Sequence, residues 1–395
     1  MPCAGAAGRA DALRHDGAAL ICVVINSLGR GGAERSILLL VEELLRRGLR
    51  VQLVCLFQLP DEYRLPDTLR SHVVRLGASS FLQGLWRLYR HLRGQPVRVV
   101  YSLMPQANLA ALLVCRSLGL PLLTSERTTP TLFYASRAKL VAALLPHAAS
   151  SRAVFISHYA RDHGLPANAL GRAVRRNACV LHNPVPCSIP PDAAGASRQR
   201  RLDRLCRWLD RGVGASGAAN LTLLLASRLV PGKGILEFLQ AALPLLGDGG
   251  GMRIVIAGAG PLQDPVRGFA QRHRLGDQLL LLGFVEDIQT ALALADVVVL
   301  SSESEGFGRV GFEAYLAGCL VLGTRRNSFG HEVSAHAPAW HVADDQATLD
   351  HALAALAQAA MPDDGADIGQ MRSALDLHTH ADRFLAIVTE VLPHV

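Results

Sequence analysis

Short apolar runs alternate along the chain with segments whose apolar residues recur every three or four positions. The first run, "ALICVVINSL", predicts a buried strand and is followed by the glycine loop "GRGG". In the next segment, "AERSILLLVEELLRRG", Ile37, Val41 and Leu44 recur at helical spacing, and Gly48 is suited to end the helix. The runs "VQLVCLF", "VRVVYSL", "LPLLTS" and "RAVFIS" repeat the strand pattern. Strands that alternate with helices predict a parallel sheet covered on both faces.

The same rhythm restarts after an interruption rich in Pro, Gly, Ser and Arg, from Ser188 to Asn220. The second series holds the strands "LTLLLAS", "MRIVIAG", "QLLLLG" and "DVVVLS". A chain of 395 residues also exceeds what one hydrophobic core usually spans. We therefore predict an α/β fold with two facing Rossmann-like domains. The predicted parts are a disordered tail at 1–17, an N-terminal domain at 18–190, a linker with a short helix at 191–219, a C-terminal domain at 220–375, and at 376–395 a helix that packs back on the N-terminal domain.

Composition adds a compartment to this prediction. No apolar run approaches the roughly 18 residues that cross a bilayer, and the first residues lack the apolar core of a signal peptide. The eight cysteines are scattered and form no CxxC pair, so buried reduced thiols are favoured over disulfides or zinc ligands. The histidines show no metal-ligand spacing. These features favour a cytoplasmic protein without a metal.

The stretch "SSESEGFGRVGFEAYLAG" carries two glutamates, Glu305 and Glu313. On one helix they would lie about 12 Å apart and about 80° out of phase, too far for a carboxylate dyad. We instead place Glu305 in the glycine-rich loop after strand "DVVVLS" and Glu313 on the helix that begins near Arg309. Ligands of open α/β sheets bind at that edge, and helix N-termini favour phosphate oxygens. An elongated ligand of sugar, diphosphate and ribose fits this arrangement; the alternative is two solvated surface residues.

A second loop, "SRLVPGKG", places Arg228 and Lys233 beside glycines at a strand's carboxyl end. Such cations suit a diphosphate, although the P-loop spacing is absent. A surface pair is the more common explanation of two such cations, and their position at the sheet edge favours a site. The loops "GRGGAE" and "GAGPL" nearly match the dinucleotide fingerprint but hold Glu34 and Gln263 at its third glycine position. An NAD enzyme is therefore not expected. Both loops still allow close approach to a ligand, or simply form tight turns.

Taken in order, "GRGGAER", "VLHNPV", "SRLVPGKG", "IVIAGAGPL", "LLGFVEDIQTALALADVVVLSSESEGFGRVGFEAYLAG" and "FGHEV" resemble the retaining GT-B glycosyltransferases of family 4, the glycosyl transferases group 1. The resemblance begins near Leu20 and is most specific from Arg228 to Glu332. It implies an interdomain donor cleft, and a nucleotide-diphosphate sugar, most simply a UDP-sugar, as co-substrate rather than a cofactor.

Carried over residue by residue, the resemblance implies that Glu305 contacts the transferred sugar. Glu126, in "LLTSERTTP", stands where the family often has a histidine, and is the second catalytic candidate. The remaining implied residues bind the donor, with no metal ligand among them: Gly31, Gly32, Arg228, Lys233, Gly258, Phe284, Phe307, Gly308, Arg309, Val310 and Glu313. The "SER" variant is a mild indication of bacterial members that build lipid-linked or envelope glycans.

The leading hypothesis is thus a retaining transferase that moves a hexose or N-acetylhexosamine by front-face displacement. Arg228 and Lys233 would neutralise the leaving diphosphate without a metal. A glycoside hydrolase is one alternative, because two carboxylates can flank a glycosidic bond, but it needs no phosphate loop. The other alternative is an inactive sugar-nucleotide-binding protein.

Charge divides the chain unequally. Residues 1–211 carry 29 Lys/Arg and 13 Asp/Glu, whereas 212–395 carry 11 and 20. The basic half includes "FLQGLWRLYRHLRG" and "TLFYASRAKLVAALLP", which mix Arg, aromatic and aliphatic residues. Such helices either pack on the sheet or lie on an anionic leaflet. We predict peripheral binding to the inner face of the plasma membrane and a glycan or polyprenyl-diphosphate-linked acceptor. No motif supports a nucleic-acid partner.

Overall fold

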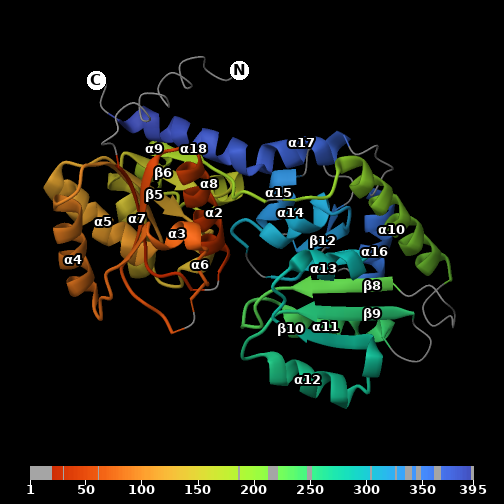
Figure 1. Cartoon of the computed structure of the whole chain (residues 1–395). Helices are drawn as coiled ribbons and strands as arrows, with labels where there is room; N and C mark the ends of the chain where they lie inside the picture. Colours follow the sequence, from red (N-terminus) through yellow and green to blue (C-terminus); the bar gives the residue numbers. More distant parts are fainter. Residues whose placement is uncertain are drawn as a thin grey trace. The chain divides into compact units, whose positions relative to one another are not determined.

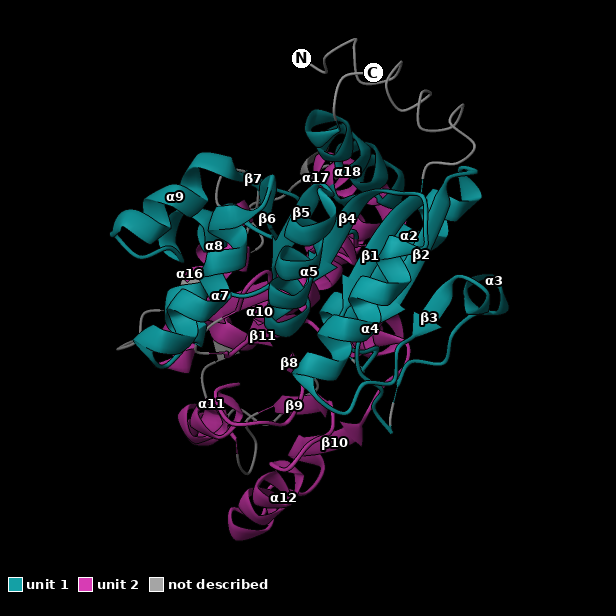
Figure 2. Cartoon of the chain, turned by 90° about the vertical axis from the view of Figure 1, so that its left-hand side faces the viewer, with its two compact units in different colours: residues 1–184, 375–395 teal, residues 185–374 magenta. Residues whose placement is uncertain are grey.

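The computed structural model describes residues 20–29, 31–60, 62–185, 187–211, 221–246, 251–302, 305–324, 327–333, 340–343, 348–359 and 366–392. The predicted tail at 1–17 lies outside them. The chain divides into two compact units (Figure 2). The first consists of Met1–Pro184 and Leu375–Val395, and the second of Val185–Ala374. Each unit is built on its own parallel sheet, as the sequence pattern predicts.

Seven strands form the sheet of the first unit, in the order β3-β2-β1-β4-β5-β6-β7 (Figure 2). Their bounds are β1 Leu20–Ile25, β2 Arg50–Cys55, β3 Val73–Arg75, β4 Val97–Leu103, β5 Leu122–Glu126, β6 Arg152–Phe155 and β7 Ala178–Val180. The helices are α2 Gly32–Arg46, α3 Asp67–Arg70, α4 Phe81–Arg93, α5 Pro105–Leu118, α6 Pro130–Phe133, α7 Arg137–Ala149, α8 His158–His163, α9 Ala169–Asn177 and α18 Leu377–Val391. All neighbouring strands pair in parallel.

Strand β1 explains why this sheet is covered on both faces. All six of its residues are buried, and successive side chains point to opposite sides. Ile21, Val23 and Ile25 belong to the core beneath α2 and α18, whereas Cys22 and Val24 belong to the core beneath α4 and α5. A strand buried on both faces therefore reads as a continuous apolar run.

Helix α18 returns from the far end of the chain to complete the first unit. It packs on α2, and the ring of Phe384 lies 5.1 Å from that of Tyr101 on β4. At the helix surface Glu43 accepts hydrogen bonds from Arg46 and Arg47 and lies 2.8 Å from Nδ1 of His378. An apolar core contact and a charged cluster thus both fasten α18 to α2.

Six strands form the sheet of the second unit, in the order β10-β9-β8-β11-β12-β13. Figure 1 labels β8, β9, β10 and β12 of this sheet. Their bounds are β8 Leu221–Ala226, β9 Met252–Ala257, β10 Leu279–Gly283, β11 Val297–Leu300, β12 Leu320–Thr324 and β13 Trp340–Ala343. The helices are α10 Pro191–Arg211, α11 Ile235–Ala242, η1 Leu243–Leu245, α12 Gln263–Arg272, η2 Gly276–Gln278, α13 Ile288–Leu294, α14 Arg309–Leu316, α15 Ser328–Val333, α16 Leu349–Ala359 and α17 Ala366–Leu375.

Helix α10 differs from the short linker helix expected at 191–219. It spans 21 residues and packs on α16, β12 and β8 inside the second unit. Arg201 is the reason: its guanidinium is buried and donates hydrogen bonds to the carbonyls of Leu292, Ala295 and Ala317. Those carbonyls lie in or just after the last turns of α13 and α14, so one side chain satisfies two helix ends.

Both sheets reverse their strand order at one point, between β1 and β4 in the first unit and between β8 and β11 in the second. In open α/β sheets, ligands bind outside the carboxyl ends of the strands at this switch point. Each unit therefore presents one edge at which a ligand site is expected. Among the described residues, no helix is both long and apolar enough to cross a membrane.

Candidate functional site

The switch point of the second unit lies between two of the predicted loops. Arg228 and Lys233 follow β8, and Glu305 follows its neighbour β11. Nζ of Lys233 lies 2.8 Å from Oε2 of Glu305, an ion pair in which both side chains are largely buried. The structure thus brings together a cation and a carboxylate separated by 72 residues in sequence.

Glycines keep these loops close to each other. Gly234 has a φ of +64°, and a Cβ there would overlap the carbonyl oxygen of Ser301 at the end of β11. Ser301 Oγ donates a 2.8 Å hydrogen bond to the carbonyl of Lys233, which fixes the same approach. A Cβ at Gly258, after β9, would likewise overlap the carbonyl oxygen of Ser227. Only glycine permits the backbone of three strand ends to meet so closely.

The N-terminus of α14 forms the other side of this edge. Gly308, its N-cap, has a left-handed backbone with φ +72°, and no side chain caps the helix. Arg309 Nε donates a 2.9 Å hydrogen bond to Oε1 of Glu313 one turn later, and both side chains are largely buried. The ring of Phe307 stacks on that of Phe312 at 4.4 Å. The predicted stretch from Phe307 through Val310 to Glu313 therefore opens a helix, with its backbone N–H groups directed at the sheet edge.

Phe284 lies further along the edge, after the outer strand β10. Its ring is exposed, and the preceding Gly283 accepts a 2.7 Å hydrogen bond from the N–H of Gly258. The ends of β9 and β10 are thus joined, although β9 separates Phe284 from the loop that follows β8.

In the first unit, the glycine loop that precedes α2 carries a side chain that the motif did not single out. Gly31 is the N-cap of α2, and a Cβ there would overlap Oε2 of Glu34. Around Gly32, by contrast, an added Cβ would meet nothing within 4 Å. The carboxylate of Glu34 lies over the start of the helix, where negative charge is favourable. A ligand can therefore approach the backbone closely at Gly32, whereas the side chain of Glu34 covers Gly31.

Glu126 ends β5 and is 4% exposed. Its Oε1 accepts hydrogen bonds from the backbone N–H groups of Arg127 and Thr128 and from the Thr128 hydroxyl, at 2.7–2.9 Å. Its Oε2 lies 3.4 Å from Nε2 of His147, a fully buried side chain on α7. Nδ1 of His147 is in turn 2.8 Å from the hydroxyl of Thr124. Oε1 is thus held by the loop that follows β5, whereas Oε2 has only the nearby ring of His147, whose Nε2 makes no hydrogen bond among the described residues.

Arg127 is a residue that sequence reasoning passed over. It donates a 2.6 Å hydrogen bond to Asn183, in the "HNPV" segment after β7, while its buried Nε has no hydrogen-bond partner among the described residues. Burial lowers the pKa of Arg127, and the nearby Tyr101, Glu34 and Glu126 act in the opposite direction. The guanidinium remains charged, because its ordinary pKa is far above neutrality.

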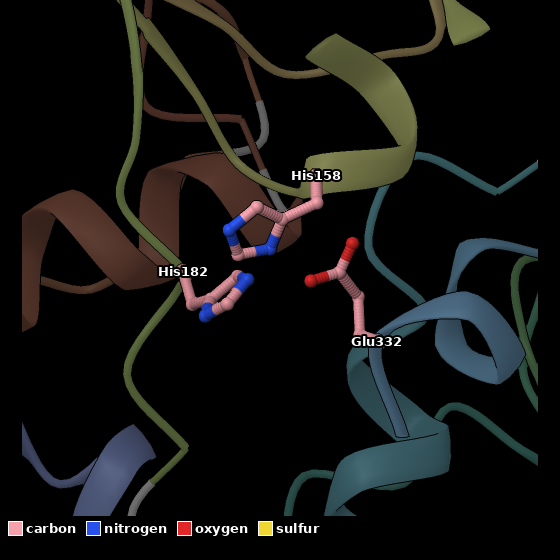
Figure 3. Close-up of side chains that lie close together, drawn as sticks. All are labelled: His158, His182 and Glu332. Carbon is pink, nitrogen blue, oxygen red and sulfur yellow. The ribbon is translucent and has the colours of Figure 1, made fainter. Parts of the chain in front are cut away.

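Two histidine rings lie close together here, one of them within the "HNPV" segment. The rings of His158, at the start of α8, and His182, after β7, lie 5.2 Å apart (Figure 3). Burial, with Arg127 second, lowers the pKa of His380 on α18 to about 3, so this ring is neutral. Its Nδ1 lies 2.7 Å from the carbonyl of His182, to which a neutral ring donates its proton. Figure 3 also labels Glu332, which comes from α15 of the second unit.

Residues 207–364 match the family model described as glycosyl transferases group 1, and residues 30–189 match that of glycosyltransferase family 4. The chain has the two parallel α/β domains of the GT-B fold. The matched segments contain all of the candidate site residues named from the sequence.

An uncharacterized glycosyltransferase of Methanocaldococcus jannaschii is 34% identical to this chain over 102 residues, or 25% of the chain and 26% of that relative. Among solved structures, Anabaena HepE in complex with UDP and glucose has a TM-score of 0.69 at 18% identity, over 92% of this chain and 98% of that one. The lipopolysaccharide outer core galactosyltransferase WaaB has a TM-score of 0.67 at 11% identity, over 94% and 99%. At these identities the two structures establish a shared fold.

Proposed function

We propose that this protein transfers a hexose or N-acetylhexosamine from a nucleotide-diphosphate sugar, with retention of configuration, to a lipid-linked or envelope glycan. The observation that carries the proposal is the meeting of Lys233 and Glu305 at the switch point of the second unit. A diphosphate and a sugar are what a cation and a carboxylate, side by side at such an edge, can bind together. The HepE structures, whose complexes contain UDP, favour a UDP-sugar as the donor.

Lys233 and Glu305 exchange partners when the donor binds. The ion pair keeps both charges compensated in the empty site, and the donor diphosphate then takes Lys233 together with Arg228. Glu305 becomes available to accept hydrogen bonds from hydroxyls of the transferred sugar. As the glycosidic bond breaks, negative charge grows on the leaving diphosphate, and the two cations stabilise it. We expect transfer without a metal.

The N-terminus of α14 holds the remainder of the donor. The backbone N–H groups from Phe307 to Val310 bind phosphate oxygens, aided by the positive end of the helix. Glu313, buried one turn further, accepts hydrogen bonds from the ribose hydroxyls, and Arg309 keeps its carboxylate in place. The exposed ring of Phe284 is a further donor contact.

For Glu126 we propose a positioning role in place of the catalytic one that its sequence position suggested. Its Oε1 accepts three hydrogen bonds from its own loop, and the side chain is buried. Arg127, whose backbone N–H donates to this carboxylate, is half-buried, and its charged guanidinium is better suited to contact the acceptor. Gly32 supplies the close backbone approach expected of the glycine loop.

A cytoplasmic protein at the inner face of the plasma membrane is the setting we propose. The described cysteines are all free, four of them buried, and burial raises the pKa of Cys22, Cys55, Cys115 and Cys319. Buried thiols that stay protonated suit a reducing compartment. The proposal of a lipid-linked acceptor is supported by the excess of Lys and Arg in residues 1–211.

A thermal-shift and calorimetric screen of nucleoside diphosphates tests the donor, followed by transfer assays with radiolabelled UDP-sugars and membrane extracts. We expect UDP to bind, Arg228→Ala and Lys233→Ala to weaken it, and product NMR to show the donor's anomeric configuration. Release of sugar from an aryl glycoside without nucleotide would instead favour a hydrolase. Binding of no diphosphate would overturn the proposal.

A further inference from the structure

The first unit exposes large apolar side chains in one short part of its sequence. Seven of them lie between α4 and α7, including Leu82 at 74%, Trp86 at 55% and Phe133 at 62% exposed. The others are Leu113, Leu132, Val141 and Leu145. Among the described residues of the whole chain, four further large apolar side chains are exposed, namely Leu59, Leu282, Phe284 and Leu294. Concentration in one region distinguishes this pattern from the single exposed leucines found on most proteins.

Helix α4 presents a complete outward stripe. Leu82, Trp86, Arg90 and Arg93 follow one another at intervals of four, four and three residues and are all exposed, so they share one face. The guanidinium of Arg90 lies 4.7 Å above the Trp86 ring. The opposite face of the helix buries Leu88 and Leu92 in the core between the helix and the sheet. The outward stripe is therefore apolar in its first half and cationic in its second. Its four side chains are exposed, so they do not belong to the core of the first unit.

Helices α5 and α7 extend this stripe into a surface. Helix α4 packs on α5, and α5 packs on α7, so the three lie side by side on one face of the sheet (Figure 2). Helix α5 exposes Leu113 and Arg116. Helix α7 exposes Lys139 in its first turn, followed by Val141 and Leu145. We name the exposed side chains of α4, α5, α6 and α7 the α4–α7 face.

Charge on this part of the chain has one sign. Residues 68–161 contain twelve Lys or Arg and a single acidic residue, Glu126, which is buried. The α4–α7 face therefore presents no carboxylate to a ligand, and its complement is a surface that is both anionic and able to receive apolar side chains. An anionic bilayer has both properties, because Trp and Leu enter the headgroup boundary while Arg binds lipid phosphates. Nucleic acid matches the charge but gives exposed aliphatic side chains nothing to bury against.

We propose that the α4–α7 face is the surface by which this protein lies on an anionic membrane. The inference deepens the proposed function and rests on it, because it supplies the position from which the first unit would reach a lipid-linked acceptor. Helices α4, α5 and α7 each begin near the carboxyl edge of their sheet and run back along it, as parallel connections require. Leu82, Phe133 and Val141 therefore stand near the edge at which ligands bind, and the membrane contact lies beside it.

Vesicle sedimentation tests the face, with vesicles of phosphatidylcholine alone and of equal parts phosphatidylcholine and phosphatidylglycerol. We expect the protein to sediment with the anionic vesicles at low salt and to be released at high salt. The double variant Leu82→Ser/Trp86→Ser should lower the partition coefficient about tenfold. Both side chains would be buried in the membrane, and losing part of their apolar surface there is enough for that factor. Arg90→Gln/Arg93→Gln should lower it on anionic vesicles only.

The matched control is Leu294→Ser, which removes a leucine of similar exposure, 59%, from α13 of the second unit. It should bind vesicles as the unaltered protein does. Equal binding by all variants, binding to duplex RNA in preference to vesicles, or a dimer in solution that Leu82→Ser/Trp86→Ser dissolves would each overturn the inference. Calorimetric titration of the unaltered protein with UDP separates the two proposals. A protein that binds UDP but does not bind anionic vesicles would overturn the membrane face alone. A protein that binds anionic vesicles but no nucleoside diphosphate would overturn the proposed function alone.

Discussion

Replacing Gly234 with alanine tests the close approach on which the candidate donor loop depends. Gly232 and Gly234 both have positive φ values, +81° and +64°, so alanine at either position brings a left-handed strain of about 1–2 kcal/mol. Their surroundings differ. At Gly232 an added Cβ meets nothing within 4 Å, whereas at Gly234 it would overlap the carbonyl oxygen of Ser301 and lie 3.0 Å from the carbonyl carbon.

The added methyl of Gly234→Ala meets backbone, so no change of rotamer relieves the overlap. Overpacking of this kind costs about 1–3 kcal/mol, and the total with strain is about 2–5 kcal/mol, against about 1–2 for Gly232→Ala. At about 2–4 °C per kcal/mol for a domain of this size, the two variants should differ clearly in melting temperature. Separation of the loops would also break the Ser301 hydrogen bond to the carbonyl of Lys233.

Melting curves and calorimetric titration with UDP, run on both variants, provide the measurement. We expect Gly232→Ala to keep nearly normal UDP affinity and Gly234→Ala to lose both stability and affinity. Equal destabilisation by the two substitutions would refute the close approach. A destabilised Gly234→Ala protein with undiminished UDP affinity would refute the assignment of this loop to the diphosphate.

Four further outcomes are expected. Arg228→Ala and Lys233→Ala should each lower single-turnover transfer about 10²–10³-fold, because the cations act on charge that develops in the transition state; a change in KM alone would contradict this. Glu313→Ala should weaken donor binding by about 1.5–3 kcal/mol, and unchanged affinity in calorimetry would remove the ribose role. Transfer should persist in excess EDTA, whereas full dependence on added manganese or magnesium would refute the metal-free reaction. Burial raises the pKa of Glu43, but hydrogen bonds from arginines and a histidine outweigh it and lower the pKa from 4.5 to about 2. Because the folded value is the lower one, Glu43 stabilises the protein above about pH 4.5 and loses this effect as the pH falls toward about 2. Glu43→Gln should therefore flatten the acid limb of a melting-temperature profile, and an unaltered limb would exclude the cluster as its cause.

Sequence pattern was sufficient for the architecture because buried parallel strands leave a strong local signal. The run that became β1 is apolar throughout, and its six residues are all buried. Helix α10 lacked such a signal. Its Arg-rich sequence is typical of a solvated linker, yet Arg201 is buried because the ends of α13 and α14 supply carbonyl acceptors. Those partners lie about ninety or more residues away in sequence, where no local pattern reports them.

Motif spacing likewise placed Lys233 and Glu305 at strand ends, and the switch point then brings them together. It could not identify the partners of Glu126. His147 lies on α7, the second helix after Glu126, and approaches the carboxylate only through the packing of α7 on β5. The sequence pattern marked Glu34 only as a departure from the dinucleotide fingerprint, not as a side chain that covers Gly31. Side chains recruited by packing, rather than by a motif, are the part of a site that sequence reading misses.

The first unit takes its residues from both ends of the chain, whereas the second is continuous. During synthesis the second unit can therefore close its core before the first, even though the first begins to emerge earlier. Until α18 leaves the ribosome, the apolar surface that Phe384 and Val388 will cover on the first unit stays open. A stalled or truncated chain would expose that surface beside a completed second unit. Helix α18 thus completes the core of the first unit after the second unit has been synthesised, and until then the nascent chain exposes apolar surface that the folded protein covers.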